Sequence, residues 1–310
     1  MKILLRLLPI LLALGLCFSC TQDSGQPSAV SVLFPNPPDT VNLVKGVDFL
    51  SEEELNAIID EPTVMRNGKS RPKGIIAYPQ DGDDFRKADL DESYWRHVSS
   101  KESDFRGASF RTADCSEGDF SRSDFRASDM RWTFLDFSNL KHANFKQAKM
   151  FHVHASDVKF DSCDFRGANM FGMEAHYAKF RNCDFSNALM KDCELLGSDL
   201  TGSVGVKANM IRAVLTYAVL DSTDFSYADF TGAGLGEVTF VNARLSGVNF
   251  QGSHLQGADF TGADLTGCNF FAAEMDSTIF IGAINIPKQV KEMIEGGVVT
   301  GVIQELQATK

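Results

Sequence analysis

Beyond its first eighteen residues the sequence contains no apolar run that could cross a membrane as a helix. It has no Gly-rich phosphate loop, no nucleophile elbow and no zinc-finger spacing. Basic residues are a minority, because 30 Lys and Arg stand against 41 Asp and Glu and leave a net charge of −11. This acidity disfavours nucleic-acid binding, which usually needs a basic face. We therefore expect a protein that is not an enzyme, binds no nucleic acid and carries no cofactor.

The N-terminus has the organisation of an export signal. Lys2 and Arg6 make a positive region, and residues 7–18 make an apolar core that is too short to span a bilayer. The core ends just before Ser19-Cys20, which resembles the signal of a bacterial lipoprotein, where a small residue precedes the cysteine that receives the lipid. An ordinary secretory signal, cleaved near the same place, is the alternative.

The lipoprotein resemblance implies where the protein resides. It assigns residues 1–19 to a signal peptide and makes Cys20 the lipid-attachment site. The protein would then be held by this lipid at a membrane of the bacterial cell envelope. Thr21 follows the cysteine in place of Asp, which in lipoproteins of enteric type implies the outer membrane.

Two segments separate this signal from the body of the chain. Residues 21–40 are rich in Ser, Pro, Asp and Gln and have no clear periodicity, so we expect residues 20–45 to form a flexible tether. Residues 46–82 are expected to form an N-terminal cap with a short helix. Ser51 and Glu54 make a capping box that opens this helix, which should run through about Ile59.

The body of the chain is a repeat of five residues. From residue 85 to residue 280 every fifth position is marked, and Phe, Leu or Met fills most of these positions. A small residue usually stands two positions earlier, with Asp or Asn often between them, as in SDFRG, CDFRG, ADFTG and ADLTG. This pattern resembles the pentapeptide-repeat family. The resemblance implies an all-β solenoid, a right-handed quadrilateral β-helix whose large and small residues point inwards.

The length of one coil follows independently from the sequence. Like residues recur at intervals of twenty, as in the column Phe105, Phe125, Phe145, Phe165, Phe185 and the column Met130, Met150, Met170, Met190, Met210. Four pentads therefore make one turn, and residues 83–283 predict about ten coils stacked at about 4.8 Å. The methionines are interpreted as core filler. Gly205 interrupts the Phe column, so we expect a local bulge or kink near residues 203–207.

The last segment, residues 284–310, is expected to form a helical cap. Pro287 suits the first turn of a helix that begins near Asn285 and runs through about Ile294. The resemblance also implies that a C-terminal element of this kind can mediate dimers, so a homodimer through the cap is one expected partnership. The other partner would be an unidentified protein or envelope component.

Charged residues stand in two ladders on adjacent outward strips of one face. The acids recur at intervals of twenty: Asp84, Asp104, Asp124, Asp164 and Asp184. The bases stand beside them: Arg86, Arg106, Arg126, Lys146 and Arg166. One interpretation is a docking stripe for a charged partner. We favour the other, in which neighbouring acids and bases neutralise one another on a solvated face.

A second outward set lies around Ala155 and Ala175, two small residues in consecutive core positions that should sink this face or leave a void. The outward residues on this face and its adjoining corner are His152, His154, Glu174, His176 and Glu194. Imidazole and carboxylate side chains suit zinc, so His154, Glu174 and His176 form a candidate metal site. The alternative is simple pairing of His with Glu in solvent.

An apolar column accompanies these polar residues. Phe151 and Phe171 share an outward column with Ile211, and exposed apolar patches often mark a contact surface. A loop, a cap or a second copy of the chain that covers the column is the alternative. Together with the His and Glu residues these side chains make up the candidate binding surface.

Cysteines fall at inward positions of the repeat: Cys115, Cys163, Cys183, Cys193 and Cys268. Cys163 and Cys183 stand one coil apart on the same face. Parallel inward side chains at that spacing lie slightly too far apart for a disulfide, so we expect reduced, buried thiols.

Three functions remain after these exclusions. The first is a non-enzymatic, lipid-anchored envelope protein, a rigid rod that presents a face to a protein or polymer. The second is a DNA-mimicking pentapeptide-repeat protein acting on a type II topoisomerase, which the acidic total favours and the export signal disfavours. The third is a metal-binding protein that uses His154, Glu174 and His176.

Overall fold

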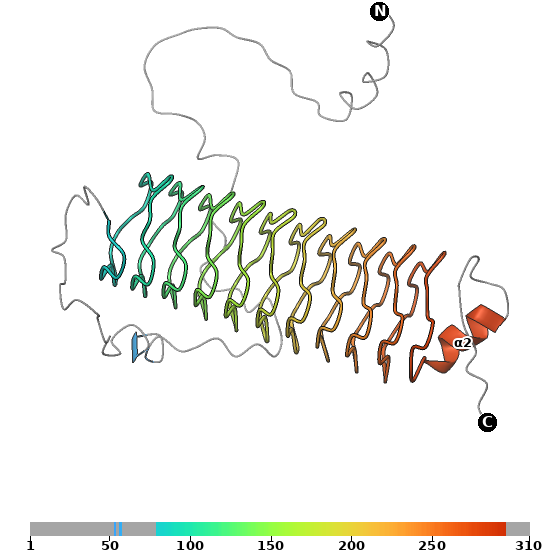
Figure 1. Cartoon of the computed structure of the whole chain (residues 1–310). Coiled ribbons are helices and arrows are strands. Elements are labelled where there is room, and N and C mark those ends of the chain that lie inside the picture. Colours follow the sequence, from blue (N-terminus) through green and yellow to red (C-terminus); the bar gives the residue numbers. More distant parts are fainter. Residues whose placement is uncertain (1–52, 54–55, 58–78, 296–310) are drawn as a thin grey trace, which may run out of the picture. The chain divides into compact units, whose positions relative to one another are not determined.

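The structure, a computed structural model, describes residue 53, residues 56–57 and residues 79–295 (Figure 1). The backbone is helical at the three described positions before residue 79. The predicted signal peptide, the lipid-attachment residue Cys20, the tether and most of the N-terminal cap lie outside the described residues.

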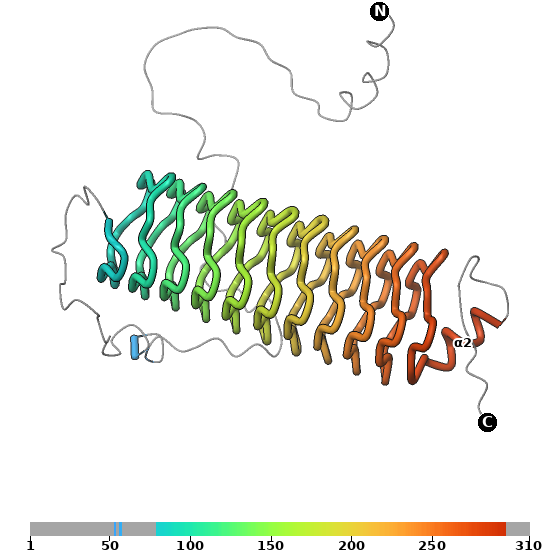
Figure 2. Tube along the Cα trace, in the orientation of Figure 1, coloured from blue at the N-terminus to red at the C-terminus, as the bar shows by residue number. Residues whose placement is uncertain are grey.

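The described body is a solenoid in which one turn takes twenty residues. Parallel bridges join Asp84 to Asp104 and Asp104 to Asp124, and the same step of twenty continues to the bridge between Asp264 and Ile284. Each side of a coil contributes one bridge residue, so the sheets are built from single bridges rather than from long strands. Figures 1 and 2 show the coils stacked along one axis, with the sequence running steadily from one end to the other.

The hydrogen bonds explain why five residues suffice for each side. The N–H of Phe165 donates to the carbonyl of Asp184 on the next coil at 2.7 Å, and the N–H of Asp184 donates back to the carbonyl of Cys163 at 3.1 Å. Between the sides the chain turns through a left-handed residue two positions after each large core residue. At non-glycine corners φ lies between +49°, at His152, and +62°, at Tyr217.

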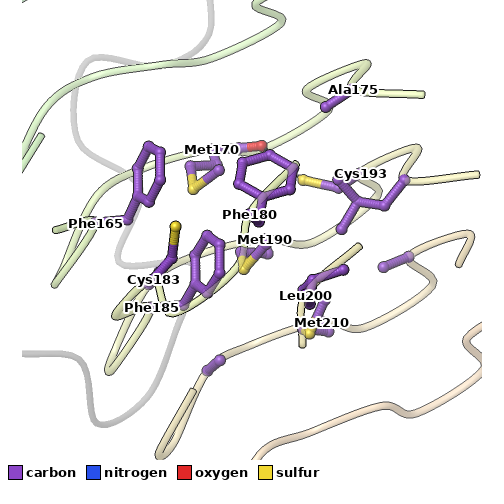
Figure 3. Close-up of a cluster of buried hydrophobic side chains, with 14 of the residues drawn as sticks. Phe165, Met170, Ala175, Phe180, Cys183, Phe185, Met190, Cys193, Leu200 and Met210 are labelled. Carbon is purple, nitrogen blue, oxygen red and sulfur yellow. Dashed lines mark hydrogen bonds between the residues drawn. The ribbon is translucent and has the colours of Figure 1, made fainter. Parts of the chain in front are cut away.

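The core is one continuous column of side chains. Phe165 and Met170 are completely buried, and so is Ala168 between them. Rings on successive coils are parallel, with centroids 4.8 Å apart for Phe105 and Phe125 and 5.1 Å apart for Phe165 and Phe185. Figure 3 shows this stacking of Phe165 with Phe185 and, beside it, of Met170 with Met190. The predicted twenty-residue turn and inward positions are therefore confirmed.

The bulge predicted near residues 203–207 is wrong. Val204 is bridged both to Asp184 and to Asp224, and the N–H of Gly205 donates to the carbonyl of Asp224 at 2.7 Å, as elsewhere in the solenoid. The space left by the missing side chain is taken by Phe225 from the next coil. A Cβ at Gly205 would lie only 2.1 Å from Cε1 of that ring. The ring of Phe225, rather than a change of backbone, accommodates the glycine.

The cysteines of the described solenoid are free and buried, as predicted: Cys115, Cys163, Cys183, Cys193 and Cys268. Four of these thiols, those of Cys163, Cys183, Cys193 and Cys268, donate to backbone carbonyls of the preceding coil. The thiol of Cys163 donates to the carbonyl of Leu140 at 2.9 Å, and that of Cys183 donates to the carbonyl of Phe160 at 3.0 Å.

One helix, α2 (Lys288–Glu295), follows the last coil, close to the predicted bounds. Val290 is buried and Ile286, just before the helix, is nearly so, and both belong to the same core cluster as the coils. Met293 and Ile294 pack against this cluster. In the described part of the chain no helix has both the length and the apolarity to cross a membrane.

Candidate binding face

One lateral side of the solenoid carries the predicted histidines and glutamates. We call His154, Glu174, His176 and Glu194 the His–Glu face. The bridges place Phe134, His154 and Glu174 directly above one another on successive coils. The rings of Phe134 and His154 are parallel with centroids 4.9 Å apart, and His154 Nδ1 lies 3.1 Å from Glu174 Oε2. His154 is thus held between an aromatic ring and a carboxylate.

The second histidine makes a separate pair. His176 Nε2 lies 3.4 Å from Glu194 Oε2, while His176 Nδ1 is buried and has no hydrogen-bond partner among the described residues. Each histidine therefore faces the glutamate of the following coil. The members of the candidate metal site, His154, Glu174 and His176, are divided between two His–Glu pairs, as the alternative interpretation expects. Across residues 53, 56–57 and 79–295 no three His, Cys, Asp or Glu residues are grouped as metal ligands would be.

The adjoining corner is aromatic. We call Trp132, Phe151, His152 and Phe171 the aromatic corner. Phe151 stacks on Phe171 at 5.0 Å and meets Trp132 edge-on at 5.9 Å. His152 meets the Phe151 ring edge-on at 4.3 Å, and its Nδ1 lies 3.1 Å from the carbonyl oxygen of Gly172. The rings are partly exposed and make one continuous surface beside the His–Glu face.

Ile211 stands apart from these rings. It occupies the same column as Phe171 but two coils further on, and it is partly exposed. Phe151, Phe171 and His152 therefore form one ring cluster, which does not include Ile211.

Larger side chains two positions earlier accompany Ala155 and Ala175, behind which a void was predicted. Both alanines are completely buried, and the positions two residues earlier hold Val153 and Met173, which are also completely buried. Those positions usually carry Ala, Ser or Cys. Large and small residues have exchanged places on this side, so the larger side chains of Val153 and Met173 accompany the two alanines in the core. The exchange could have been predicted from the sequence by comparing the usual large and small positions of each pentad together.

The acid and base ladders neutralise one another. Arg86 Nη2 is 2.7 Å from Asp84 Oδ2, and Arg86 Nε is 3.6 Å from Asp104 Oδ2 on the next coil. Hydrogen bonds from Arg86 lower the pKa of the Asp84 carboxyl, and they outweigh the opposing effect of its burial. Arg106 is paired in the same way with Asp104 and Asp124 and is only 1% exposed.

Sequence analysis overlooked the next corner of the solenoid. Phe137, Tyr177 and Tyr217 are 62%, 54% and 64% exposed, more than the aromatic corner residues. Lys159 and Lys179 lie beside them on the adjoining side. The available signal was an aromatic residue at intervals of forty, which a search at intervals of twenty passes over.

These features define a β-solenoid with polar and aromatic side chains exposed along its lateral surface. The sequence profile of pentapeptide repeats matches the chain in eight copies, over residues 84–126, 103–136, 138–172, 175–204, 206–242, 233–270 and 243–282. The chain belongs to the pentapeptide-repeat family, and this membership implies a right-handed β-helix.

Solved pentapeptide-repeat structures resemble the chain. HetL from the cyanobacterium Nostoc sp. strain PCC 7120, a protein involved in heterocyst differentiation regulation, is 20% identical, with a TM-score of 0.43 over 63% of this chain and 88% of that one. Rfr23 from the cyanobacterium Cyanothece 51142 is 17% identical, with a TM-score of 0.33 over 43% and 87%. QnrB1, a plasmid-mediated fluoroquinolone resistance protein, is 19% identical, with a TM-score of 0.33 over 67% and 89%. Among curated proteins no sequence matches significantly.

Proposed function

We propose that this chain is a non-enzymatic binding protein of the bacterial cell envelope, a rod that presents one lateral side to a protein or polymer. The supporting observation is the concentration of exposed rings on that side. Phe134 is 41% exposed, and Phe137 and Tyr177 exceed half. Large apolar side chains in solvent are characteristic of contact surfaces.

The solenoid is suited to hold side chains in place for a binding partner rather than to catalyse a reaction. Every coil is fixed to its neighbours by the same hydrogen bonds, so outward side chains stand at regular intervals on a rigid support. The polar residues of the His–Glu face are arranged in pairs along the rod. Membership of the pentapeptide-repeat family fits a structural or binding role.

The proposed anchor is a lipid on Cys20, with residues 20–45 as the tether between membrane and rod. Thr21 favours the outer membrane as the site. A homodimer through the C-terminal cap is a further proposal, because α2 covers only one end of the core with a short amphipathic helix. Gel filtration with light scattering would reveal it.

Metabolic labelling with a palmitate analogue tests the anchor. Labelled protein should fractionate with membranes, and Cys20→Ala should abolish the label. Cys17→Ala is the matched control, because it removes a neighbouring cysteine that the lipoprotein resemblance does not use. Label that persists in Cys20→Ala, or a full-length cytoplasmic product, would contradict the proposal.

The acidic composition also fits imitation of DNA toward a type II topoisomerase, but the charges of the described solenoid argue against it. A DNA mimic needs a nearly uniform negative surface. Here Asp124 Oδ2 lies 2.8 Å from Arg126 Nη2, and Asp84 is paired with Arg86 in the same way. The ladder is locally neutral, which together with the export signal favours the envelope role.

A further inference from the structure

The corner overlooked in the sequence carries a ladder of rings with a period of its own. We call Phe137, Tyr177 and Tyr217, together with Lys159 and Lys179, the corner strip. The three aromatic residues occupy the same left-handed corner position, with φ of +60°, +58° and +62°. They recur every forty residues, which is every second coil. Because the backbone repeats, the three side chains leave it in the same direction.

The spacing of these rings follows from the coils. Neighbouring coils are stacked at about 4.8 Å, so equivalent positions two coils apart are separated by about 10 Å along the rod. That is about the length of two sugar rings in an extended β-1,4-linked polysaccharide. The residues between the rings on this corner are Asp157 and Gly197, neither of which is aromatic. A polymer along the rod would therefore meet a ring at every second sugar.

The position of Tyr177 depends on the glycine beside it. A Cβ at Gly197 would lie 2.8 Å from both Cδ1 and Cε1 of Tyr177. The ring therefore lies along the surface, over the next coil, rather than projecting freely into solvent. A ring held along the axis of the rod offers a platform for a planar or chair-shaped partner group.

Two lysines add charge to the same strip. Lys159 and Lys179 are bridged neighbours on successive coils, and both are exposed. Neither makes an ion pair with an acid of the described residues, although Asp157 stands on the same corner. Stacked like charges repel each other, and an anion between them removes this repulsion. In a chain with a net charge of −11 this is a local site for a negative group.

We propose that the corner strip binds an extended acidic polysaccharide. Sugar rings stack on Phe137, Tyr177 and Tyr217, and carboxylates of the polymer pair with Lys159 and Lys179. Equal spacing of like side chains on a rigid rod recognises a repeating ligand, whereas a globular protein partner requires no such period. This inference names the partner class of the rod and so rests on the proposed function.

The test uses the full-length protein, purified in detergent, and oligomers of β-1,4-linked mannuronate. Isothermal titration should give a hexamer that binds and a dimer that binds much more weakly, because a hexamer is long enough to reach all three rings and a dimer covers only one. Tyr177→Ala should weaken hexamer binding by roughly tenfold. Lys159→Gln with Lys179→Gln should remove most of the salt dependence of binding.

Matched controls lie on another corner. Tyr227→Ala removes a tyrosine that is 64% exposed, against 54% for Tyr177, and that also lies against a glycine, Gly247. Lys207→Gln removes an exposed lysine. Both should bind as the wild type does. Neutral cello-oligosaccharides of equal length should bind more weakly than mannuronate.

Failure to bind the hexamer, equal losses in Tyr177→Ala and Tyr227→Ala, or equal affinity for neutral chains would each overturn the inference. Circular dichroism of every variant separates loss of binding from loss of folding. Because the binding assay does not involve the anchor, its failure and a failure of Cys20 labelling are distinguishable. Loss of both would remove the proposed function as well.

Discussion

The ring of Tyr177 lies against the backbone of Gly197 on the next coil, where a Cβ would come within 2.8 Å of two ring atoms. Gly197 also has φ of +62°, a conformation that alanine adopts only with strain. A substitution of Gly197 is therefore expected to lower stability in two ways, through backbone strain and through a clash with the Tyr177 ring.

We predict that Gly197→Ala destabilises the solenoid more than Gly252→Ala does. Gly252 has the same φ of +62° but no atom within 4 Å of the place that a Cβ would take, so it reports the backbone strain alone, about 1 kcal/mol. Urea unfolding measures both. Gly197→Ala should also weaken mannuronate binding through displacement of Tyr177. Equal losses of stability at the two sites would show that the ring moves aside without cost.

Phe225 is expected to be the most sensitive phenylalanine of its column. Its ring fills the space beside Gly205 in addition to its own position. Phe225→Ala should therefore leave a larger cavity than Phe185→Ala and lie nearer the upper end of the range of about 3–5 kcal/mol for such substitutions. The free energy of unfolding of the two variants gives the comparison. A smaller loss for Phe225→Ala than for Phe185→Ala would contradict this account of Gly205.

The fold was predictable because one geometric rule governs most of the chain. Phe165 and Phe185 are twenty residues apart in sequence and stacked in space, and every buried column obeys the same step. Pairing of His154 with Glu174 follows from that step as well. The outward surface can thus be placed residue by residue before any coordinates exist.

The repeat does not predict side-chain conformations, which decide which neighbour each side chain contacts. The ring of Phe225 fills the gap at Gly205, and the five-residue pattern of the sequence does not reveal this. His176 pairs with Glu194 rather than joining His154, because side-chain torsions decide which neighbour is reached. The exposure of Tyr177 likewise depends on how its ring lies over Gly197.

Buried thiols should be unreactive in the native protein. Burial raises the pKa of Cys193 to about 12, and the thiol donates to the carbonyl of Met170 at 2.8 Å. Because the thiolate is the reactive form, maleimide should label Cys193 only after unfolding. Ser162→Cys supplies an exposed control that should label at once. Rapid native labelling of Cys193, found by peptide mass mapping, would mean that the coils open locally.

The last prediction concerns the pH dependence of the stability of the fold, which we expect to involve Asp161. Asp161 is only 8% exposed, and its carboxylate lies 2.8 Å from Arg181 Nε and 3.1 Å from Lys141 Nζ. Burial alone would raise the pKa of Asp161, but the hydrogen bonds and charges of Arg181 and Lys141 lower it below the ordinary value. A carboxyl with a lowered pKa in the folded state stabilises the fold above the pKa of the unfolded chain, near pH 4, and this contribution is lost as the pH falls through the folded value.

Asp161→Asn should therefore cost about 1–2 kcal/mol at neutral pH, because it leaves two cations without their carboxylate. The gap to the wild type should close as the pH is lowered below about 4. Asp157→Asn, at an exposed acid without an ion pair in the described structure, should change stability little at any pH. Urea unfolding at a series of pH values measures all three proteins. A gap between Asp161→Asn and the wild type that stays constant down to strongly acidic pH would show that the carboxylate does not stabilise the fold through these two bases.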